Sequence, residues 1–263
     1  MNLEYVPLLQ LQRDLHALPR DRARFRQYLQ TIFSEDGTIA ELPSLIAMNP
    51  MGKEHVAERL DDYLALDADG IAARATTEAA ARLAELPGNC KVTLVIVDDL
   101  KGGWTNRYAE EFTWRFQSGP ADPPALPRWL KQQWITGILW SSEAASERVV
   151  REATLTAIYR SAYVQQHGPA RTLRERMDQE GHVMTMAGCA GPVLDDEDIA
   201  YTREVIEPCL DDQDKRTTIE CLFGDAAGGT LGFTPRGLSP WAGLALALYD
   251  ARNELTVESI HDR

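Results

Sequence analysis

The segment Lys91–Val97 restricts the fold of this chain more than any other part of the sequence. Its residues, KVTLVIV, are rich in β-branched types and almost continuously apolar. A strand that is buried on both faces has this composition, whereas a strand with one face in water alternates apolar and polar residues. We therefore expect a strand here, in a sheet that other elements cover on both sides.

Two further segments are strand candidates. Tyr108 to Phe116 follows the glycine-containing turn Asp98 to Trp104 and partly alternates apolar with charged residues, which predicts a hairpin partner for the first strand. Trp134 to Trp140 is the third candidate. The proline-rich stretch Ser118 to Pro127 between them is expected to be an exposed loop.

The rest of the chain has the periodicity of helices. Apolar residues recur at helical spacing through the first 86 residues, and Pro87-Gly88 ends this portion. A long helix is expected over 142–166, and Thr172 with Glu175 forms a capping-box pattern for a second helix over 172–187. We predict an α+β fold, with an N-terminal helical portion over 1–88 and a compact portion over 89–263 in which a small sheet packs on this helix pair.

Charge and cysteine content exclude several classes of function. Forty acidic and 27 basic residues give a net charge of −13, which repels phosphate backbones and anionic lipid surfaces, so we expect no nucleic-acid or membrane partner. The longest apolar stretches are far shorter than the roughly 20 residues of a membrane span. The four cysteines form no CxxC pair, and no secretory signal precedes them, so free thiols in the cytoplasm are expected.

Three motifs carry a resemblance to a known family. The first expected helix of the pair contains Arg151-Glu-Ala-Thr-Leu155, and the second opens on Thr172-Leu173 and reaches Glu180-Gly181. Further on come the segments LFGD at 222–225 and GLSPWAGLAL at 237–246. Over residues 90 to 250 the chain resembles a poorly characterised bacterial family of predicted zinc-dependent proteases, whose third zinc ligand is a glutamate on a second helix, as in gluzincins.

This resemblance implies a zincin-like fold and assigns roles to several residues. Glu152 takes the place of the water-activating general base, and Glu180 that of the third ligand. Both histidines of the His-Glu-x-x-His motif are missing, because Arg151 and Leu155 stand at their positions. An arginine stays protonated and cannot bind zinc.

We therefore expect no zinc and no zinc peptidase activity. Arg151 can supply the positive charge that the metal would have placed beside Glu180, so we predict an ion pair between these two residues. The plainer interpretation is that both are solvated surface charges, whose contact is worth about 0 to 1 kcal/mol.

The first functional hypothesis is a peptidase-like scaffold without zinc, a pseudoenzyme that binds a small molecule or a protein in the former cleft. The residues expected to line this cleft are Arg151, Glu152, Leu155, Tyr159 and Glu180.

Two alternatives stay open. The chain is an active metal-dependent hydrolase if its zinc ligands have moved, in which case Glu180, His182, His167 or a cysteine would bind the metal. It is an enzyme of unrelated chemistry if the turn at 104–108 holds a substrate. The ligand-binding candidates on this turn are Trp104, Asn106, Arg107 and Tyr108. His16 and His55 have no recognisable partner in the sequence.

Overall fold

The computed structural model describes residues 1–34, 41–100, 105–116 and 134–261, with side chains up to residue 254. It divides into two compact units. The first unit comprises residues 1–105 and 122–162, and the second comprises residues 106–121 and 163–263. The sequence analysis placed the end of the N-terminal helical portion at residue 88, and the strand that begins at Asn89 pairs with a strand from the N-terminus.

The first unit is built on a three-stranded sheet in the order β1-β2-β3. Its strands are β1 (Asn2–Tyr5), β2 (Asn89–Val97) and β3 (Trp134–Trp140). All of them are parallel, and the register pairs Tyr5 with Val92 on one side of β2 and Val92 with Ile135 on the other. The β-branched segment therefore forms the central strand, as predicted. The short strand β1 was not expected from the sequence.

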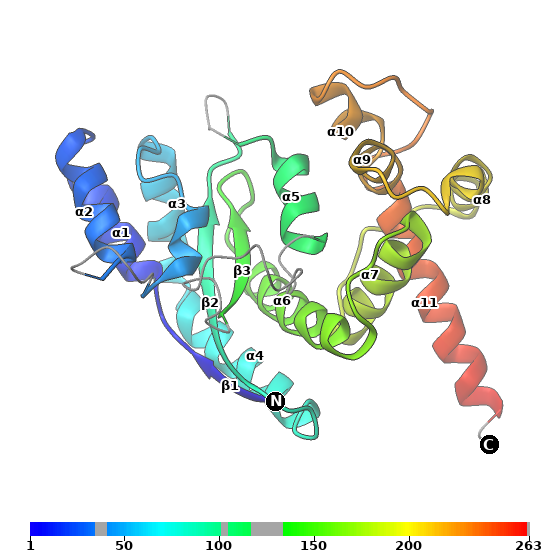
Figure 1. Cartoon of the computed structure of the whole chain (residues 1–263), viewed down its shortest axis with the longest axis horizontal. Helices are drawn as coiled ribbons and strands as arrows, with labels where there is room; N and C mark the ends of the chain where they lie inside the picture. The colour runs from blue at the N-terminus through cyan, green and yellow to red at the C-terminus, as the bar shows by residue number, and fades with distance from the viewer. Residues whose placement is uncertain (35–40, 101–104, 117–133, 262–263) are drawn as a thin grey trace. The chain divides into compact units, whose positions relative to one another are not determined.

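Helices cover both faces of this sheet (Figure 1). Leu94 and Ile96 of β2 pack in one cluster with residues of α3, α4 and α6, whereas Val95 packs on the opposite face with residues of α1, α2 and η1. The alternation of these neighbours confirms that β2 is covered on both sides. The helices are α1 (Leu9–Ala17), α2 (Arg22–Ile32), η1 (Pro43–Ala47), α3 (Glu54–Ala65), α4 (Ala68–Arg82) and α6 (Glu147–His167), the last of which continues into the second unit.

A buried glutamine extends the sheet beyond the end of β1. The side chain of Gln12 is fully buried, donates to the carbonyl oxygen of Leu94 at 3.0 Å and accepts from the amide of Ile96 at 2.9 Å. These are the two backbone groups that the next residues of a longer β1 would have satisfied, and buried backbone groups need partners. Gln12 therefore fixes α1 over the carboxyl half of β2.

The second unit is helical over its described residues. Its core joins α7 to α11 at Gly181, where an added Cβ would lie 2.4 Å from the carbonyl oxygen of Ala247. The glycine of the Glu-Gly motif thus allows two helix backbones to approach closely. The helices are α5 (Arg107–Phe116), α7 (Leu173–Ala187), α8 (Asp196–Ile206), η3 (Glu207–Cys209), α9 (Lys215–Phe223), α10 (Asp225–Thr230) and α11 (Ala242–His261).

Two expectations for this region have opposite outcomes. The helix pair is confirmed as α6 and α7, and Thr172 and Glu175 form the predicted capping box. The hairpin strand at 108–116 is wrong, because this segment is helix α5. Tyr108, Phe112 and Phe116 are spaced four residues apart, which places them on one helix face.

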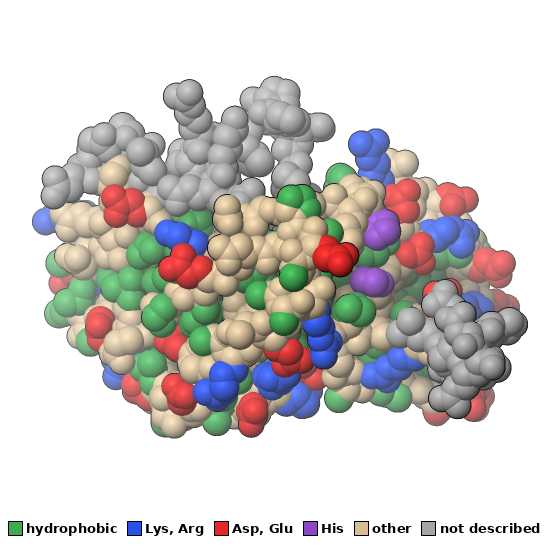
Figure 2. Space-filling model, turned by 90° about the horizontal axis from the view of Figure 1, so that it is seen from below, with side chains coloured by type: hydrophobic (Ala, Val, Ile, Leu, Met, Phe, Trp, Pro, Cys, Tyr) green, Lys and Arg blue, Asp and Glu red, His purple; other side chains and the backbone are tan. Residues whose placement is uncertain are grey.

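The structure is α+β, as predicted, with a sheet of parallel strands. Among the described residues, no helix is long and apolar enough to cross a membrane. On the face drawn in Figure 2, basic side chains are interspersed with acidic ones rather than gathered into one patch. Ser118 to Pro127, expected to be a loop, lies outside the described residues.

Candidate functional site

The predicted cleft residues of α6 hold this helix against α4 in the first unit. Arg151 pairs with Glu78 at 2.8 Å, and this arginine lowers the pKa of the glutamate below its usual value. The hydroxyl of Tyr159 accepts from Arg82 of α4 at 3.5 Å, and the tyrosine is buried. Leu155 is buried as well. Packing between helices therefore explains the positions of Arg151, Leu155 and Tyr159.

The remaining position on α6, that of the general base, belongs to a surface ion pair. Glu152 accepts from Arg148 at 3.1 Å, one helical turn earlier on the same helix. Pairs of this kind between exposed residues four apart contribute only about 0.3 to 0.5 kcal/mol.

Glu180 has a different cation from the one predicted. The sequence led us to pair it with Arg151, but its carboxylate bonds to the guanidinium of Arg115 on α5. Arg115 also contacts Glu111 at 2.8 Å, so one arginine bridges two carboxylates. The ion pair Arg115–Glu180 therefore replaces the predicted ion pair Arg151–Glu180.

The cluster around Glu180 is buried. The Glu180 side chain has no exposed area, that of Arg115 is 17% exposed, and Gln179 donates to the glutamate at 3.1 Å. Burial lowers the pKa of Arg115, but the charges of Glu111 and Glu180 outweigh this effect and raise the pKa above its usual value. The arginine is therefore a permanent cation beside Glu180. A glutamate that is bonded to a guanidinium in this way is not available as a zinc ligand.

The turn proposed as a ligand site forms the start of α5. Asn106 accepts from the amide of Ala109 at 3.1 Å, as an N-cap does, and donates to Thr230 at 2.8 Å. Arg107 and Tyr108 both lie against Trp241, the first as a cation over the ring at 5.3 Å and the second with ring centroids 5.5 Å apart. Trp104 lies outside the described residues.

The alternative metal ligands have aromatic contacts. The rings of His167 and His182 lie 4.4 and 5.3 Å from the ring of Tyr163, and burial lowers the pKa of His182 below its usual value, with a smaller effect from His167. All four cysteines are free. No group of three or more His, Cys, Asp and Glu side chains within the described ranges could hold a metal ion.

Sequence reasoning missed a polar cluster at the carboxyl ends of β2 and β3. Asp98 follows β2, is buried, and bonds to His55 at 2.8 Å and to the hydroxyl of Ser141 at 3.1 Å. The next residue, Asp99, accepts from Ser142 at the end of β3. Proteins with parallel sheets commonly bind their ligands at the carboxyl ends of the strands. An Asp-Asp pair directly after a buried strand was the available signal.

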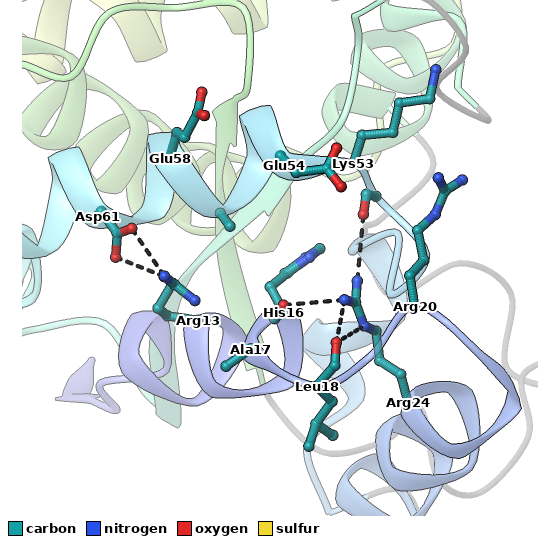
Figure 3. A pocket seen from close by; sticks show the side chains of 12 residues that line it. Arg13, His16, Ala17, Leu18, Arg20, Arg24, Lys53, Glu54, Glu58 and Asp61 are labelled. Atoms are coloured by element: carbon teal, nitrogen blue, oxygen red, sulfur yellow. Dashed lines mark hydrogen bonds and ion pairs between the residues drawn. The ribbon is translucent and has the colours of Figure 1, made fainter.

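Next to this edge, in the first unit, lies a pocket of about 480 Å³ between the end of α1 and the start of α3 (Figure 3). His16, which had no partner in the sequence, contributes to its wall. Its pKa is lowered to about 4 by burial, followed by the charges of Arg24 and Arg13. The ring is therefore neutral at pH 7. The charged residues of the wall are Arg13, Arg20, Arg24, Lys53, Glu54, Glu58 and Asp61.

Comparisons of the chain with family models, with curated proteins and with solved structures found no match.

Proposed function

We propose that this protein is a non-catalytic relative of the zinc-peptidase scaffold, which acts by binding a ligand or a protein partner. The observation that carries the proposal is the buried ion pair between Arg115 and Glu180. In a zinc peptidase of this type the glutamate at the Glu180 position faces a metal cation. Here a guanidinium faces it, and the same guanidinium contacts a second carboxylate, that of Glu111.

Two features of α6 agree with the loss of catalysis. Arg151, at a histidine position, is engaged with Glu78, and Leu155, at the other, is a core residue. Glu152 is paired with Arg148 on the surface of the helix. General-base catalysis needs a carboxylate within hydrogen-bond reach of a water that a metal polarises. The contacts of Arg151 and Glu152 and the burial of Leu155 are consistent with a chain that does not carry out this step.

The two alternatives have less support. A hydrolase with relocated ligands needs side chains that converge, but Glu180 is bound to Arg115 while His167 and His182 stack on Tyr163. An enzyme with its substrate on the turn at 104–108 would have to use side chains that cap and pack α5.

The test is elemental zinc analysis of protein purified without chelator or metal-affinity resin, before and after dialysis against Zn²⁺. We expect far less than one zinc per chain, with no difference between the wild type and a Glu180→Gln variant. The variant Arg115→Met removes the cation that contacts the Glu180 carboxylate, and its zinc content is measured in parallel. A peptidase assay on a mixed peptide substrate accompanies each sample.

One zinc per chain in the wild type that disappears in Glu180→Gln would contradict the proposal and identify an active metal site. Zinc that persists in Glu180→Gln but disappears in His182→Gln would favour the relocated ligands. Arg203→Met, which removes an arginine from an exposed pair in the same unit, is the matched control.

A further inference from the structure

The pocket between α1 and α3 is locally basic in an acidic protein. Four basic side chains and three carboxylates line it, so its wall carries one net positive charge, whereas the whole chain carries −13. One pair is internal to the pocket, because Arg13 bonds to Asp61 at 2.6 Å. The other charges of the wall are therefore the ones that a ligand would meet.

Three cations of the pocket have no carboxylate partner among the described residues. Arg24 is buried and donates to backbone carbonyl oxygens, among them that of His16 at 3.1 Å, at the end of α1. Arg20 donates to the carbonyl oxygen of Met51 at 2.9 Å, and Lys53 is exposed. In Figure 3 these three side chains lie at one end of the pocket together with Glu54, and Glu58 and Asp61 lie at the other.

The start of α3 adds backbone donors at the basic end. Lys53 is the N-cap residue, and no side chain in the described part of the chain caps the free amide groups of this twelve-residue helix. Such amides, together with the helix dipole, attract anions, and phosphate groups are common at these positions. A helix end alone is not a site, so an independent feature has to indicate a ligand.

His16 supplies that feature. Its side chain is 7% exposed, and its Nε2 atom has no hydrogen-bond partner among the described residues. Figure 3 shows its ring extending from α1 toward the start of α3, where Glu54 and Lys53 lie. A buried imidazole nitrogen without a partner is unfavourable, and a ligand oxygen in the pocket would satisfy it.

From these features we infer that the pocket binds the phosphate group of a small molecule. Lys53 and Arg20 contact its oxygens, and the first amides of α3 donate hydrogen bonds to it. The Nε2–H group of His16, on α1, donates a further hydrogen bond. A phosphate presents three terminal oxygens to donors that come from several directions, whereas a carboxylate presents two. Arg24 positions the end of α1 and does not contact the ligand.

The carboxylates of the pocket indicate which chemical groups the rest of the ligand carries. Glu54 and Glu58 have no ion-pair partner among the described residues, and they accept hydrogen bonds from hydroxyl or amino groups. A cavity of about 480 Å³ exceeds a phosphate ion and is within the usual range for small-molecule pockets. The ligand class is therefore a phosphorylated small molecule with donor groups, not a nucleic acid. This inference concerns only the first unit and does not depend on the proposed loss of zinc.

The experiment titrates inorganic phosphate into the full-length protein at constant ionic strength, with chloride as the control ion. Binding is followed by calorimetry and by the ring proton signals of His16 in NMR spectra. We expect saturable binding that Arg20→Gln and Lys53→Gln each weaken about tenfold, the scale of one lost charge-assisted hydrogen bond. Arg148→Gln, an exposed arginine of α6 in the same unit that does not line the pocket, is the matched control and should bind as the wild type does.

Both test variants replace exposed residues, so folding is retained and circular dichroism verifies it. His16→Phe keeps the ring and removes the donor, and it should weaken binding as well. Three results would overturn the inference: phosphate that acts no differently from chloride, Arg20 and Lys53 variants that bind like Arg148→Gln, or acetate that binds as tightly as phosphate. The last result would identify a carboxylate site.

Discussion

Replacing Arg115 by methionine tests the ion pair on which the proposed function rests. Methionine has a similar length and volume but no charge, so the change leaves Glu180 buried without its cation. Glu111 is also close to Arg107, whose Nε lies 3.6 Å from it, so Glu180 loses more than Glu111 does. The variant therefore isolates the cost of one buried carboxylate.

The structure sets the expected size of this effect. Removing one partner of a buried pair typically costs about 3 to 5 kcal/mol, because the other charge stays desolvated. Exposed pairs are worth only about 0.2 to 1 kcal/mol. Arg203 and Asp250 form such a pair, with contacts of 3.0 and 2.6 Å and side chains that are 52% and 37% exposed. Arg203→Met is therefore the control in the same unit.

The assay is urea unfolding of both variants and the wild type at pH 8 and pH 5. In Arg115→Met the buried carboxyl of Glu180 loses its arginine partner, which raises its folded-state pKa above the unfolded value of about 4.3. The folded variant then binds a proton more readily than the unfolded chain, so its stability improves relative to the wild type as the pH falls. We expect a loss of about 3 to 5 kcal/mol at pH 8 and a clearly smaller loss at pH 5.

Two results would refute this reasoning. The first is a loss in Arg115→Met no larger than that in Arg203→Met at pH 8. The second is a loss that does not change between pH 8 and pH 5, which would mean that Glu180 takes up no proton when its cation is removed. The double variant Arg115→Met/Glu180→Met removes both charges and should recover most of the lost stability, since it leaves no unpaired charge.

Three further changes test the fold. Gln12→Leu leaves two backbone groups of β2 without partners and should cost roughly 2 to 4 kcal/mol in urea unfolding. Gly181→Ala forces a Cβ against the carbonyl oxygen of Ala247 and should lower stability by about 1 to 3 kcal/mol or more, measured by thermal unfolding. Gly229→Ala, which has open space around the added Cβ, should be neutral in the same assay. The pKa of His16 is lowered to about 4 in the folded protein, so this residue is protonated more readily in the unfolded chain. The free energy of unfolding should therefore fall as the pH falls from about 6.5 to about 4, and His16→Phe should reduce this loss.

The elements of the sheet differ in how well the sequence predicts them. β2 is predictable because six consecutive residues, Val92 to Val97, satisfy one requirement, burial on both faces. β1 has four residues, alternates intermediate with exposed positions, and is completed by Gln12, so its own residues carry little signal. α5 was mistaken for a strand because its aromatic residues, four apart, are separated by charged residues that give a partial alternation.

Side-chain partners in the candidate site are likewise difficult to predict from the sequence alone. The resemblance predicted that Glu180 pairs with a cation, but the choice between Arg151 and Arg115 depends on which helix packs beside α7. With 108–116 taken as a strand, Arg115 was not considered as a partner. His16 and Asp98 are separated by more than 80 residues, and only the crossover from β1 to β2 brings their helix and strand together.

The two units differ in whether the basic side chains on which each proposal rests have carboxylate partners, and this difference separates the two proposals. In the second unit the buried carboxylates of Glu180 and Glu111 both contact Arg115, and Glu111 also lies 3.6 Å from Arg107. The first unit leaves Arg20 and Lys53 without carboxylate partners, within the described residues, beside a histidine with an unsatisfied nitrogen. The pocket of the first unit therefore offers donors to an anion that the Arg115–Glu180 pair does not. Accordingly, Glu180→Gln should leave the affinity for phosphate unchanged, and a loss of affinity in this variant would contradict the separation of the two proposals.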